Sequence, residues 1–497
     1  MTALPTISSA RKAAFDVLLA VERGNAHADD LLRSKAVDAL SPSDRHLATT
    51  LVLGVLRWQI LLDDQLKLLT KTRKKLDPEV SVALRMGAFQ LRFLDRVPAH
   101  AAIDESVELT KQSGHRFASG LVNAVLRKLA VADSNEADSS LKELNLQSRD
   151  EIRSKKSLVS GHDFSRAESA AKTRGALVPE GTAAELALAH AHAAWLVERW
   201  TRIYGPQAAR AICRHGQAQP PRTIRLVNPA AETELRAAGV SLEPAAILAA
   251  ARSVIAGDIT PTAAYREGRV RIQDEGSQLI AELAASSTDL DQQIRSILDT
   301  CAAPGGKTLI LAERNPEARI LACESSQRRL SELRERLSAY AGHIECRLAD
   351  STALNEESAF DLVLADVPCS GTGTLGRNPE IRHRLRLEDL PRHAEQQRAI
   401  LSAALRAVRP GGHVVYSTCS LEPEENEQVV AAALAENQNA RQVSLDSRIR
   451  ALAEVGILTA AGAAQLRDCL TSEGALRLLP GALPTDGFYV ALIEKQG

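Results

Sequence analysis

The chain contains few aromatic residues and none of the cysteine patterns that hold small folds together. Phe, Trp and Tyr account for 3% of its 497 residues. Its seven cysteines are odd in number and include no Cys-x-x-Cys pair, which argues against a disulfide framework and against a zinc ribbon. We therefore predict a protein of the reducing cytoplasm that uses no structural metal.

The chain also lacks a long apolar run. No segment approaches the ~18–20 consecutive apolar residues that a membrane-spanning helix needs. Arg11, Lys12 and Asp16 interrupt the apolar residues near the beginning, unlike a signal peptide. No membrane partner is expected. A chain of 497 residues is too long for one ordinary hydrophobic core, so we expect two or three domains.

The charge of the chain is unevenly distributed. The formal net charge is −1, but residues 1–130 contain nineteen Lys and Arg against fourteen Asp and Glu, with a dense basic run at Lys71–Lys75. A basic surface of this kind is typical of RNA-binding domains. The alternative for the run itself is the solvated end of a helix.

The first 130 residues predict an all-α bundle. Residues 10–22 and 117–129 have helical apolar spacing. Ser43-Asp44 can cap a further helix, and Asp77-Pro78-Glu79 has cap, proline and acid in the order that a helix start favours. Residues 131–185 are rich in Ser, Lys, Glu, Asp and Ala. They have too little apolar surface to offset the entropy of ordering, which predicts a flexible linker.

The remainder of the chain predicts strands mixed with helices. Residues 186–272 begin with a helical stretch and continue with alternating residues, which indicates a small α+β unit. From residue 273 to 497 strands and helices alternate, which is typical of a doubly wound α/β sheet. His190 and His192 lie at the start of the 186–272 segment. A metal site would need more ligands than lie near them, so both are predicted to be surface residues.

Two cysteines lie in short loops, and each loop follows an apolar run that predicts a buried parallel strand. The first loop is Asp366–Cys369 after residues 360–365, and the second contains Cys419 after residues 413–416. A third such strand, 297–299, leads into Cys301-Ala-Ala-Pro-Gly-Gly-Lys-Thr308. Loops after parallel strands converge on one crevice, where ligands bind. Two thiols and a glycine-rich turn in one crevice predict covalent chemistry beside a bound cofactor.

Two glycine patterns suggest other cofactors but fit them poorly. Gly305-Gly306-Lys307-Thr308 resembles the end of a P-loop, yet the position of the first P-loop glycine is Cys301. Gly371, Gly373 and Gly376 match the dinucleotide pattern Gly-x-Gly-x-x-Gly, but they follow a late strand rather than the first strand of the α/β region. Neither nucleotide hydrolysis nor NAD binding is favoured.

Acidic residues follow the next three predicted strands. Glu324 can accept both hydroxyls of a ribose, Asp350 can contact an adenine edge, and Asp366 follows the fourth strand. Any one of them alone would more often be a helix cap. Together with a glycine turn whose backbone amides face a ligand, they fit S-adenosylmethionine.

Three motifs carry a family resemblance. Leu298–Thr308, Asp366–Thr374 and Tyr416–Asn426 closely resemble the Sun family of RNA cytosine-5 methyltransferases, and the helical N-terminal part is similar to the NusB-type RNA-binding domain. The resemblance covers nearly the whole chain except residues 131–185. It implies an all-α NusB-like domain, a Rossmann-like methyltransferase domain, S-adenosylmethionine as cofactor and 16S rRNA as partner. We expect a monomer.

The resemblance also implies roles for individual residues. The nucleophile is Cys419, and Cys369 is the second cysteine, which assists product release. Glu324 is the ribose acid, at a position where the family often has Asp, and Asp350 is the adenine acid. Asp366 lies near the methionine end and also acts on the base. The cofactor loop comprises Cys301, Ala302, Ala303, Pro304, Gly305, Gly306 and Lys307.

The expected chemistry requires these residue types. Carbon 5 of cytosine is a poor nucleophile until a thiolate adds to carbon 6, and a hydrogen bond from Asp366 to ring N3 favours that addition. Two rivals remain open. In a DNA cytosine-5 methyltransferase Cys369 would attack, and in a non-catalytic ribosome-assembly factor neither thiol would react. Arg377, Arg382 and Arg384 are predicted either to bind RNA phosphates or to form a solvated helix face.

Overall fold

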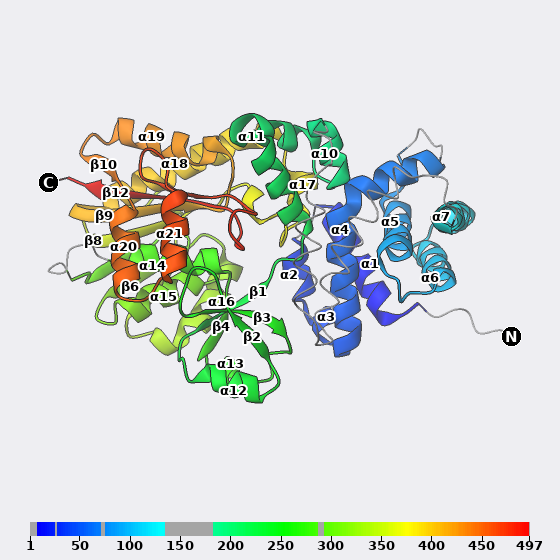
Figure 1. Cartoon of the computed structure of the whole chain (residues 1–497), viewed down its shortest axis with the longest axis horizontal. Helices are drawn as coiled ribbons and strands as arrows, with labels where there is room; N and C mark the ends of the chain where they lie inside the picture. Colours follow the sequence, from blue (N-terminus) through cyan, green and yellow to red (C-terminus); the bar gives the residue numbers. More distant parts are fainter. Residues whose placement is uncertain (1–6, 25–26, 71–74, 135–181, 287–292, 497) are drawn as a thin grey trace. The chain divides into compact units, whose positions relative to one another are not determined.

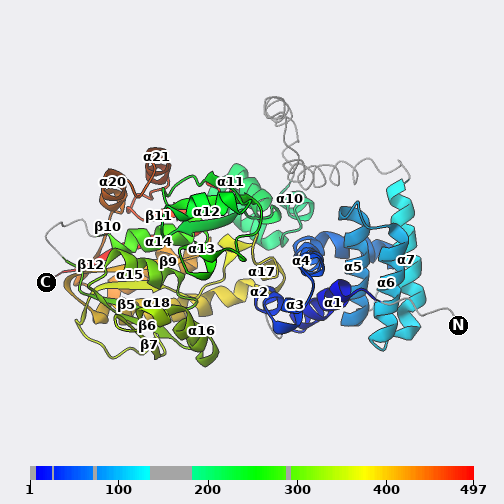
Figure 2. The ribbon, with the colours of Figure 1, turned by 90° about the horizontal axis from the view of Figure 1, so that it is seen from below.

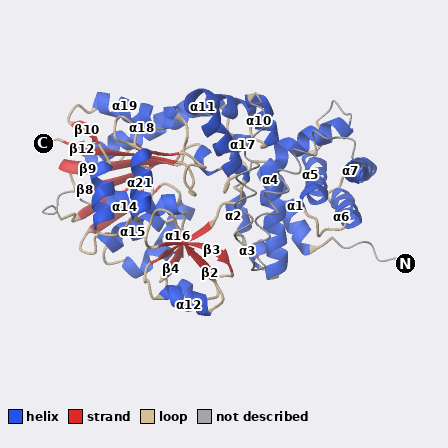
Figure 3. Cartoon of the chain, in the orientation of Figure 1, coloured by secondary structure: helices blue, strands red, loops and turns tan. Residues whose placement is uncertain are grey.

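The computed structural model of the chain describes residues 7–24, 27–70, 75–134, 182–286 and 293–496. The chain divides into two compact units. The first comprises residues 1–219 together with 375–384, and the second comprises residues 220–374 and 385–497. Among the described residues the first unit is helical, and all the strands lie in the second (Figure 3).

Most of the predicted linker lies outside the described residues. The two ends of the 131–185 segment that are described are helical, at 131–134 and 183–185. Thr182 caps the second of these helices, because its side chain accepts from Glu185 N and the Glu185 side chain accepts from Thr182 N. The basic run Lys71–Lys75 also lies outside the described part, apart from Lys75.

The first unit is a bundle of helices packed along apolar stripes. Leu18, Leu51, Leu62, Leu84 and Leu126 come from four of these helices and are at most 3% exposed in one shared core. The helices of the bundle are α1 (Ser9–Glu22), α2 (Ala28–Leu32), α3 (Lys35–Asp38), α4 (Pro42–Thr70), α5 (Pro78–Phe93), α6 (Ala99–Gln112) and α7 (Ser119–Ser134). In Figures 1 and 2, α6 lies beside α5 and α7. The predicted all-α bundle is confirmed.

The start of α5 agrees with its sequence signal, whereas the start of α4 does not. Asp77 is the N-cap of α5, and Pro78 opens its first turn, as expected. α4 begins earlier than predicted, at Pro42, and Ser41 rather than Ser43 is the capping side chain, because Asp44 N donates to Ser41 Oγ at 3.1 Å. Proline fits the first turn, which has no need of its N–H.

A ten-residue segment from the later part of the chain completes the first unit. Residues 375–384, which end in α17 (Ile381–Arg384), follow the Cys369 loop in sequence but belong to this unit. Arg382 is 2% exposed. Its guanidinium donates to four carbonyl oxygens, which are those of Arg57, Ala191, Gly216 and Leu375. Arg384 donates to Val21 O at 3.0 Å. The prediction that Arg382 binds phosphate or faces solvent is therefore wrong, since backbone carbonyls occupy its donors.

Two further helices, α10 (Ala183–Ala189) and α11 (Ala194–Gln217), also belong to the first unit. His192 between them is 1% exposed, and its Nδ1 lies 2.6 Å from His190 O. The prediction that His192 is a surface residue is wrong, because the ring packs edge-on against Trp200 with the ring centroids 6.0 Å apart. Burial holds the pKa of His192 well below its ordinary value, so the ring is neutral.

The second unit begins with a small sheet. Its strands are β1 (Arg222–Leu226), β2 (Ser241–Pro244), β3 (Ala251–Ala256) and β4 (Val270–Ile272), in the order β2-β3-β1-β4 with antiparallel neighbours. α12 (Ala231–Ala237) and α13 (Ala263–Arg266) contribute Leu235 and Ala264 to its core. The predicted α+β unit from 186 to 272 is thus divided, since helices α10 and α11 pack in the first unit.

The larger sheet has eight strands, and its order is that of a doubly wound α/β sheet. The order is β10-β12-β9-β8-β5-β6-β7, with β11 paired to β12. β7, β6, β5, β8 and β9 are parallel neighbours, whereas β12 runs antiparallel to β9. The strands are β5 (Ser296–Asp299), β6 (Arg319–Glu324), β7 (Ile344–Leu348), β8 (Phe360–Asp366), β9 (Val408–Thr418), β10 (Ala440–Val443), β11 (Leu476–Leu478) and β12 (Phe488–Lys495).

Helices cover both faces of this sheet, as its continuous apolar strands predict. Successive strand residues point to opposite faces, so Ile297 packs into one core cluster and Leu298 into the other. The first face is covered by α14 (Glu275–Ala285), α15 (Gly306–Arg314), α16 (Gln327–Leu337), α20 (Asp446–Glu454) and α21 (Ala460–Asp468). The second is covered by α18 (Leu390–Ala407) and α19 (Glu427–Glu436) (Figure 1). The predicted fold class is confirmed.

The strand order reverses at β5. The chain runs outward from β5 to β6 and β7, then returns to β8 on the other side of β5. The connections that follow β5 and β8 therefore lead away from each other at the carboxyl ends of these strands. Open α/β sheets bind ligands at such a switch point.

Candidate active site

The two cysteines predicted to react lie next to each other. Cys369 follows β8 and Cys419 directly follows β9, which are parallel neighbours in the sheet. Their Sγ atoms are 3.3 Å apart, and either thiol can donate to the other. Both residues are partly exposed, so a reactant can reach the pair.

Asp366 lies beside them at the end of β8 and is held from two sides. Lys307 Nζ donates to Asp366 Oδ2 at 2.7 Å, and Ser417 Oγ donates to Asp366 Oδ1 at 2.7 Å. Ser417 comes from β9, two residues before Cys419, so the end of β9 leads to one of the two thiols and supplies the residue that orients Asp366. Asp366 and Lys307, both predicted from sequence, are therefore in direct contact.

Lys307 carries the positive charge of the site. Burial alone would lower the pKa of Lys307, but the negative charges of Asp366, Cys419 and Asp299 outweigh it and raise the pKa. The ammonium group is thus charged at neutral pH. Lys307 therefore places a positive charge beside Asp366, at the end of the strand that leads to Cys369.

The glycine turn leads from β5 into α15. Gly305 has φ +95°, which favours glycine, and a Cβ at this position would lie 2.9 Å from Leu333 Cδ1. Ala302 N donates to Cys323 O at 2.9 Å, which ties the turn to the end of β6. Burial raises the pKa of Cys301 to about 12. Cys301 therefore stays a thiol and is not a nucleophile.

Asp299 at the end of β5 is a buried acid beneath this turn. Its Oδ2 accepts from Thr308 Oγ1 at 2.7 Å, whereas its Oδ1 is buried without a hydrogen-bond partner in the described part of the chain. Burial first, and the charge of Asp366 in addition, raise the pKa of Asp299 to about 6. Sequence reasoning gave this residue no role, although it lies in the motif Leu298–Thr308, two residues before Cys301.

The two acids predicted to contact a nucleoside differ in exposure. Glu324 is 4% exposed at the end of β6, where it accepts from Ser326 N at 2.8 Å and lies 3.3 Å from Arg329. Asp350 is exposed, and its Oδ1 accepts from Thr352 N and Thr352 Oγ1. These hydrogen bonds lower the pKa of Asp350. Asp350 thus keeps one carboxylate oxygen free of its own turn.

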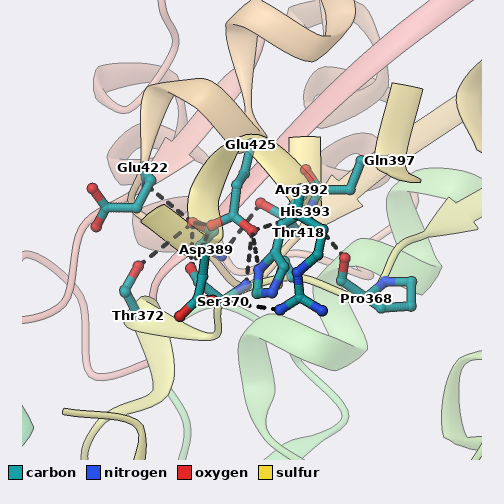
Figure 4. Close-up of polar contacts among 12 residues, drawn as sticks. Pro368, Ser370, Thr372, Asp389, Arg392, His393, Gln397, Thr418, Glu422 and Glu425 are labelled. Carbon is teal, nitrogen blue, oxygen red and sulfur yellow. Dashed lines mark hydrogen bonds and ion pairs between the residues drawn. The ribbon is translucent and has the colours of Figure 1, made fainter. Parts of the chain in front are cut away.

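Sequence reasoning also missed a buried carboxylate behind the cysteines. Glu425 accepts from Ser370 N at 2.8 Å and from Gln397 Nε2 at 3.0 Å (Figure 4). The signal was present in the motif Tyr416–Asn426, where three glutamates follow a cysteine loop within five residues. Such acids are usually solvated helix starts, and nothing in the sequence alone marks one as buried.

Similarity to known proteins follows the same division of the chain. The family model "16S rRNA methyltransferase RsmB/F" matches residues 288–494, and the NusB family model matches residues 8–131. A "Probable ribosomal RNA small subunit methyltransferase B" of Bacillus subtilis (strain 168) is 30% identical, over 99% of this chain and 99% of that protein. The "Ribosomal RNA small subunit methyltransferase B" of Pseudomonas putida is also 30% identical, over 98% of each chain.

Solved structures share the fold. The crystal structure of PH0851 covers 99% of this chain and 99% of its own, with a TM-score of 0.71 at 21% identity. A methyltransferase homolog from Pyrococcus horikoshii matches 64% of this chain and 100% of its own, with a TM-score of 0.51 at 26% identity. In the described part of the chain no helix is both long and apolar enough to cross a membrane.

Fold, site and similarity together define a Rossmann-like methyltransferase with a NusB-type helical domain. Within that class the chain belongs to the RsmB/F family of 16S rRNA methyltransferases. The family resemblance of the three sequence motifs is thereby confirmed.

Proposed function

We propose that the chain transfers a methyl group from S-adenosylmethionine to carbon 5 of a cytidine in 16S rRNA, through a covalent bond between Cys419 and carbon 6. The observation that carries the proposal is the pair of sulfur atoms 3.3 Å apart, with the Lys307–Asp366 ion pair beside them. The relatives of the chain are named as rRNA small subunit methyltransferases, which supports rRNA as the substrate.

The polar groups around the glycine turn fit the proposed cofactor. Glu324 presents a carboxylate for ribose hydroxyls, and Asp350 presents one for the adenine. Asp299 Oδ1 is a buried acceptor without a donor, which suits a cationic amino group. The loop from Cys301 to Lys307, including the left-handed Gly305, would face the cofactor with backbone amides. When bound, the cofactor supplies an electrophilic methyl group on a sulfonium.

The residues of the chain would activate the cytosine ring in steps. The Cys419 thiolate adds to carbon 6, which moves the ring electrons toward carbon 5 and makes that carbon nucleophilic. Asp366, held by Lys307 and Ser417, would take up a proton and donate a hydrogen bond to ring N3, which is an acceptor in neutral cytosine, and this would favour the addition. After carbon 5 is methylated it loses its proton to a base near Cys369. The electron pair left at carbon 5 then forms the carbon 5–carbon 6 double bond as the Cys419–carbon 6 bond breaks, and Cys419 leaves as a thiolate.

The environments of the two thiols support different roles for them. The hydrogen bond with Cys419, burial and the negative charges of Cys419 and Glu425 together raise the pKa of Cys369 well above its ordinary value. Cys369 therefore stays protonated and poorly nucleophilic. This supports Cys419, the other thiol of the pair, as the nucleophile and weighs against the DNA-type use of Cys369.

The helical domain would bind the RNA. It is similar to NusB over residues 8–131 and carries an excess of basic residues. A target base inside an RNA helix would have to rotate out of its stack, because the thiolate must approach carbon 6 from the face of the ring. We propose that the chain acts as a monomer in the cytoplasm.

The test uses labelled S-adenosylmethionine and deproteinised, unmethylated 16S rRNA with the full chain. The wild type is expected to form 5-methylcytidine, found by chromatography after nuclease digestion. Cys419→Ala is expected to abolish methylation, and Cys369→Ala to accumulate a protein–RNA adduct visible on a denaturing gel. Cys469→Ala, a partly buried cysteine elsewhere in the second unit, is the matched control and is expected to methylate as the wild type does.

Each rival predicts a different result. Methylation by Cys419→Ala would contradict the assignment of the nucleophile and favour attack by Cys369. RNA binding by the wild type without methylation of any 16S rRNA preparation would favour a non-catalytic assembly factor.

A further inference from the structure

A single buried carboxylate, that of Glu425, connects the two cysteine loops through hydrogen bonds. Glu425 ends the short helical turn Pro423–Glu425 after Cys419, and its side chain is 0% exposed. It accepts hydrogen bonds from five groups, which are Ser370 N, Ser370 Oγ, Ser420 Oγ, His393 Nδ1 and Gln397 Nε2 (Figure 4). Five donors occupy both of its oxygens, as expected for a buried ionised carboxylate.

The donors are the residues that directly follow the two cysteines. Ser370 follows Cys369, and Ser420 follows Cys419. Their hydroxyl oxygens both donate to Glu425 Oε2 and lie 3.1 Å from each other. The carboxylate therefore brings the two loops together one residue beyond the sulfur atoms, which lie 3.3 Å apart.

Two groups from α18 complete the arrangement. Gln397 Nε2 donates both to Glu425 Oε1 and to Pro368 O, the latter at 2.9 Å, so it fixes the residue before Cys369 as well. His393 Nδ1 lies 3.2 Å from Glu425 Oε1. Burial alone would raise the pKa of Glu425, but the hydrogen bonds from His393, Ser370 and Ser420 outweigh it and lower the pKa. The carboxylate is thus charged at neutral pH.

The backbone of this turn is anchored without the carboxylate. Tyr416 Oη donates to Glu425 O at 2.6 Å, and Asn426 Nδ2 donates to Ser420 O at 3.0 Å. Thr418 Oγ1 donates to the Asn426 side chain. A change confined to the Glu425 side-chain head therefore leaves these bonds in place and tests the carboxylate alone.

We propose that Glu425 is a positioning residue that holds the Cys369 and Cys419 loops together, so that the second thiol lies next to the nucleophile when the adduct must be resolved. The proposal rests on the proposed function for its effect on turnover. Its geometric part, the closeness of the two sulfur atoms, is independent of any substrate.

Glu425→Gln is the decisive variant. Glutamine has nearly the same shape but only one acceptor oxygen and no charge, so it cannot satisfy the Ser370 and Ser420 donors together with Gln397. The loops are expected to separate or to become mobile. Glu275→Gln is the matched control, because Glu275 is 2% exposed and accepts three backbone N–H groups of residues 246–248, outside the proposed site.

The first measurement is the rate at which diamide links Cys369 to Cys419, followed by peptide mass spectrometry without RNA or cofactor. Diamide takes up the two thiol hydrogens and becomes a hydrazine as the S–S bond forms. The wild type and Glu275→Gln are expected to form this bond rapidly. Glu425→Gln is expected to form it at least about 10-fold more slowly. Equal rates in wild type and Glu425→Gln, or no such bond in the wild type, would overturn the proposal.

The second measurement is turnover on 16S rRNA. Glu425→Gln is expected to lower kcat by roughly 10- to 100-fold with an unchanged KM for RNA, and to accumulate the covalent adduct, since misplacement of a catalytic group by about 1 Å has effects of this size. A purely structural role would lower the amount of active protein and leave kcat per folded molecule unchanged. Ser370→Ala, which removes one hydroxyl donor, is the smaller change and is expected to shift both measurements in the same direction.

The two measurements distinguish a failure of the proposed function from a failure of the positioning role of Glu425. If the wild type does not methylate, the proposed function fails, while the diamide rates still decide whether Glu425 positions the loops. If the wild type methylates and Glu425→Gln matches it in kcat and in adduct level, the positioning role fails.

Discussion

The charge of one buried side chain contributes to how the stability of the second unit responds to pH. Asp299 is 1% exposed, and burial raises its pKa from 3.8 to about 6. Between these two pH values the folded state binds more protons at this residue than the unfolded state does. Stability is therefore lost as pH rises through this window, and above about pH 6 the ionised group opposes folding by on the order of 2–3 kcal/mol.

Asp299→Asn is thus expected to raise the melting temperature of the cofactor-free protein at pH 8 and to change it little at pH 4. The amide keeps an oxygen for the hydrogen bond from Thr308. Calorimetry at the two pH values measures the difference. Asp350→Asn is the control, because the pKa of Asp350 is lowered rather than raised and the residue is exposed. A stabilisation by Asp299→Asn that is equal at both pH values would contradict the argument.

The residue scale is also where sequence and structure differ most at the site. Cys369, Cys419, Asp366 and Lys307 were predictable because each follows an apolar strand, and strand ends converge in this fold. Glu425 was not, because its burial depends on donors from Ser370 and α18, far from it in sequence. Hydrogen-bond partners of this kind appear only when the chain is folded.

At the scale of elements, the loops after β8 and β9 approach so closely that only glycine fits between them. Gly373 N donates to Cys419 O at 2.9 Å, and Gly487 N donates to Gly373 O at 2.8 Å. A Cβ on Gly373 would lie 2.3 Å from Gly487 O and 2.9 Å from Cys419 O. These neighbours are backbone atoms in a packed sheet end, so they have little room to move.

Gly373→Ala is therefore expected to destabilise the protein by about 1–3 kcal/mol, the usual range for overpacking, and to reduce methylation by displacing the Cys419 loop. Gly120→Ala on α7 is the matched control, since a Cβ there meets nothing within 4 Å. A helical Gly to Ala change is expected to stabilise by about 0.5–1 kcal/mol. Urea unfolding of both variants measures the contrast, and equal free energies of unfolding would refute the packing argument.

Strand boundaries show which element features the sequence predicts. The apolar runs located β5 and β8 within one residue. β9 was predicted from residue 413, but the strand begins at Val408 and contains Pro410, Gly411 and Gly412. The register between β8 and β9 shifts after Phe360, so the extra residues form an irregularity in the pairing. Proline and glycine indicate a turn locally, and the neighbouring strand overrides that signal.

At the scale of the whole molecule, buried histidines are expected to make the first unit sensitive to acid. In the first unit burial lowers the pKa of His190 to about 4 and that of His383 to about 3, from 6.5. Arg382, Arg85 and Arg384 lie near His383 and oppose its protonation further. Between pH 6.5 and these values the unfolded state binds more protons. Stability of the first unit is therefore lost as pH falls below about 6.5.

Tryptophan fluorescence measures the unfolding of the first unit selectively. The chain has three, Trp58, Trp195 and Trp200, and all lie in the first unit. Thermal unfolding followed by tryptophan fluorescence is expected at a lower temperature at pH 5 than at pH 7.5, and His383→Gln is expected to reduce that difference, because glutamine does not titrate. The same shift in His383→Gln as in the wild type would show that this histidine does not contribute.

The insertion of residues 375–384 into the first unit also has a consequence for biosynthesis. The acceptors of Arg382 at Arg57, Ala191 and Gly216 are made early, but the guanidinium that satisfies them is made much later. At ordinary translation speeds the interval is roughly ten to thirty seconds. The helical unit therefore lacks this buried donor through that interval, and its packing is completed only when the segment just after the Cys369 loop has been made.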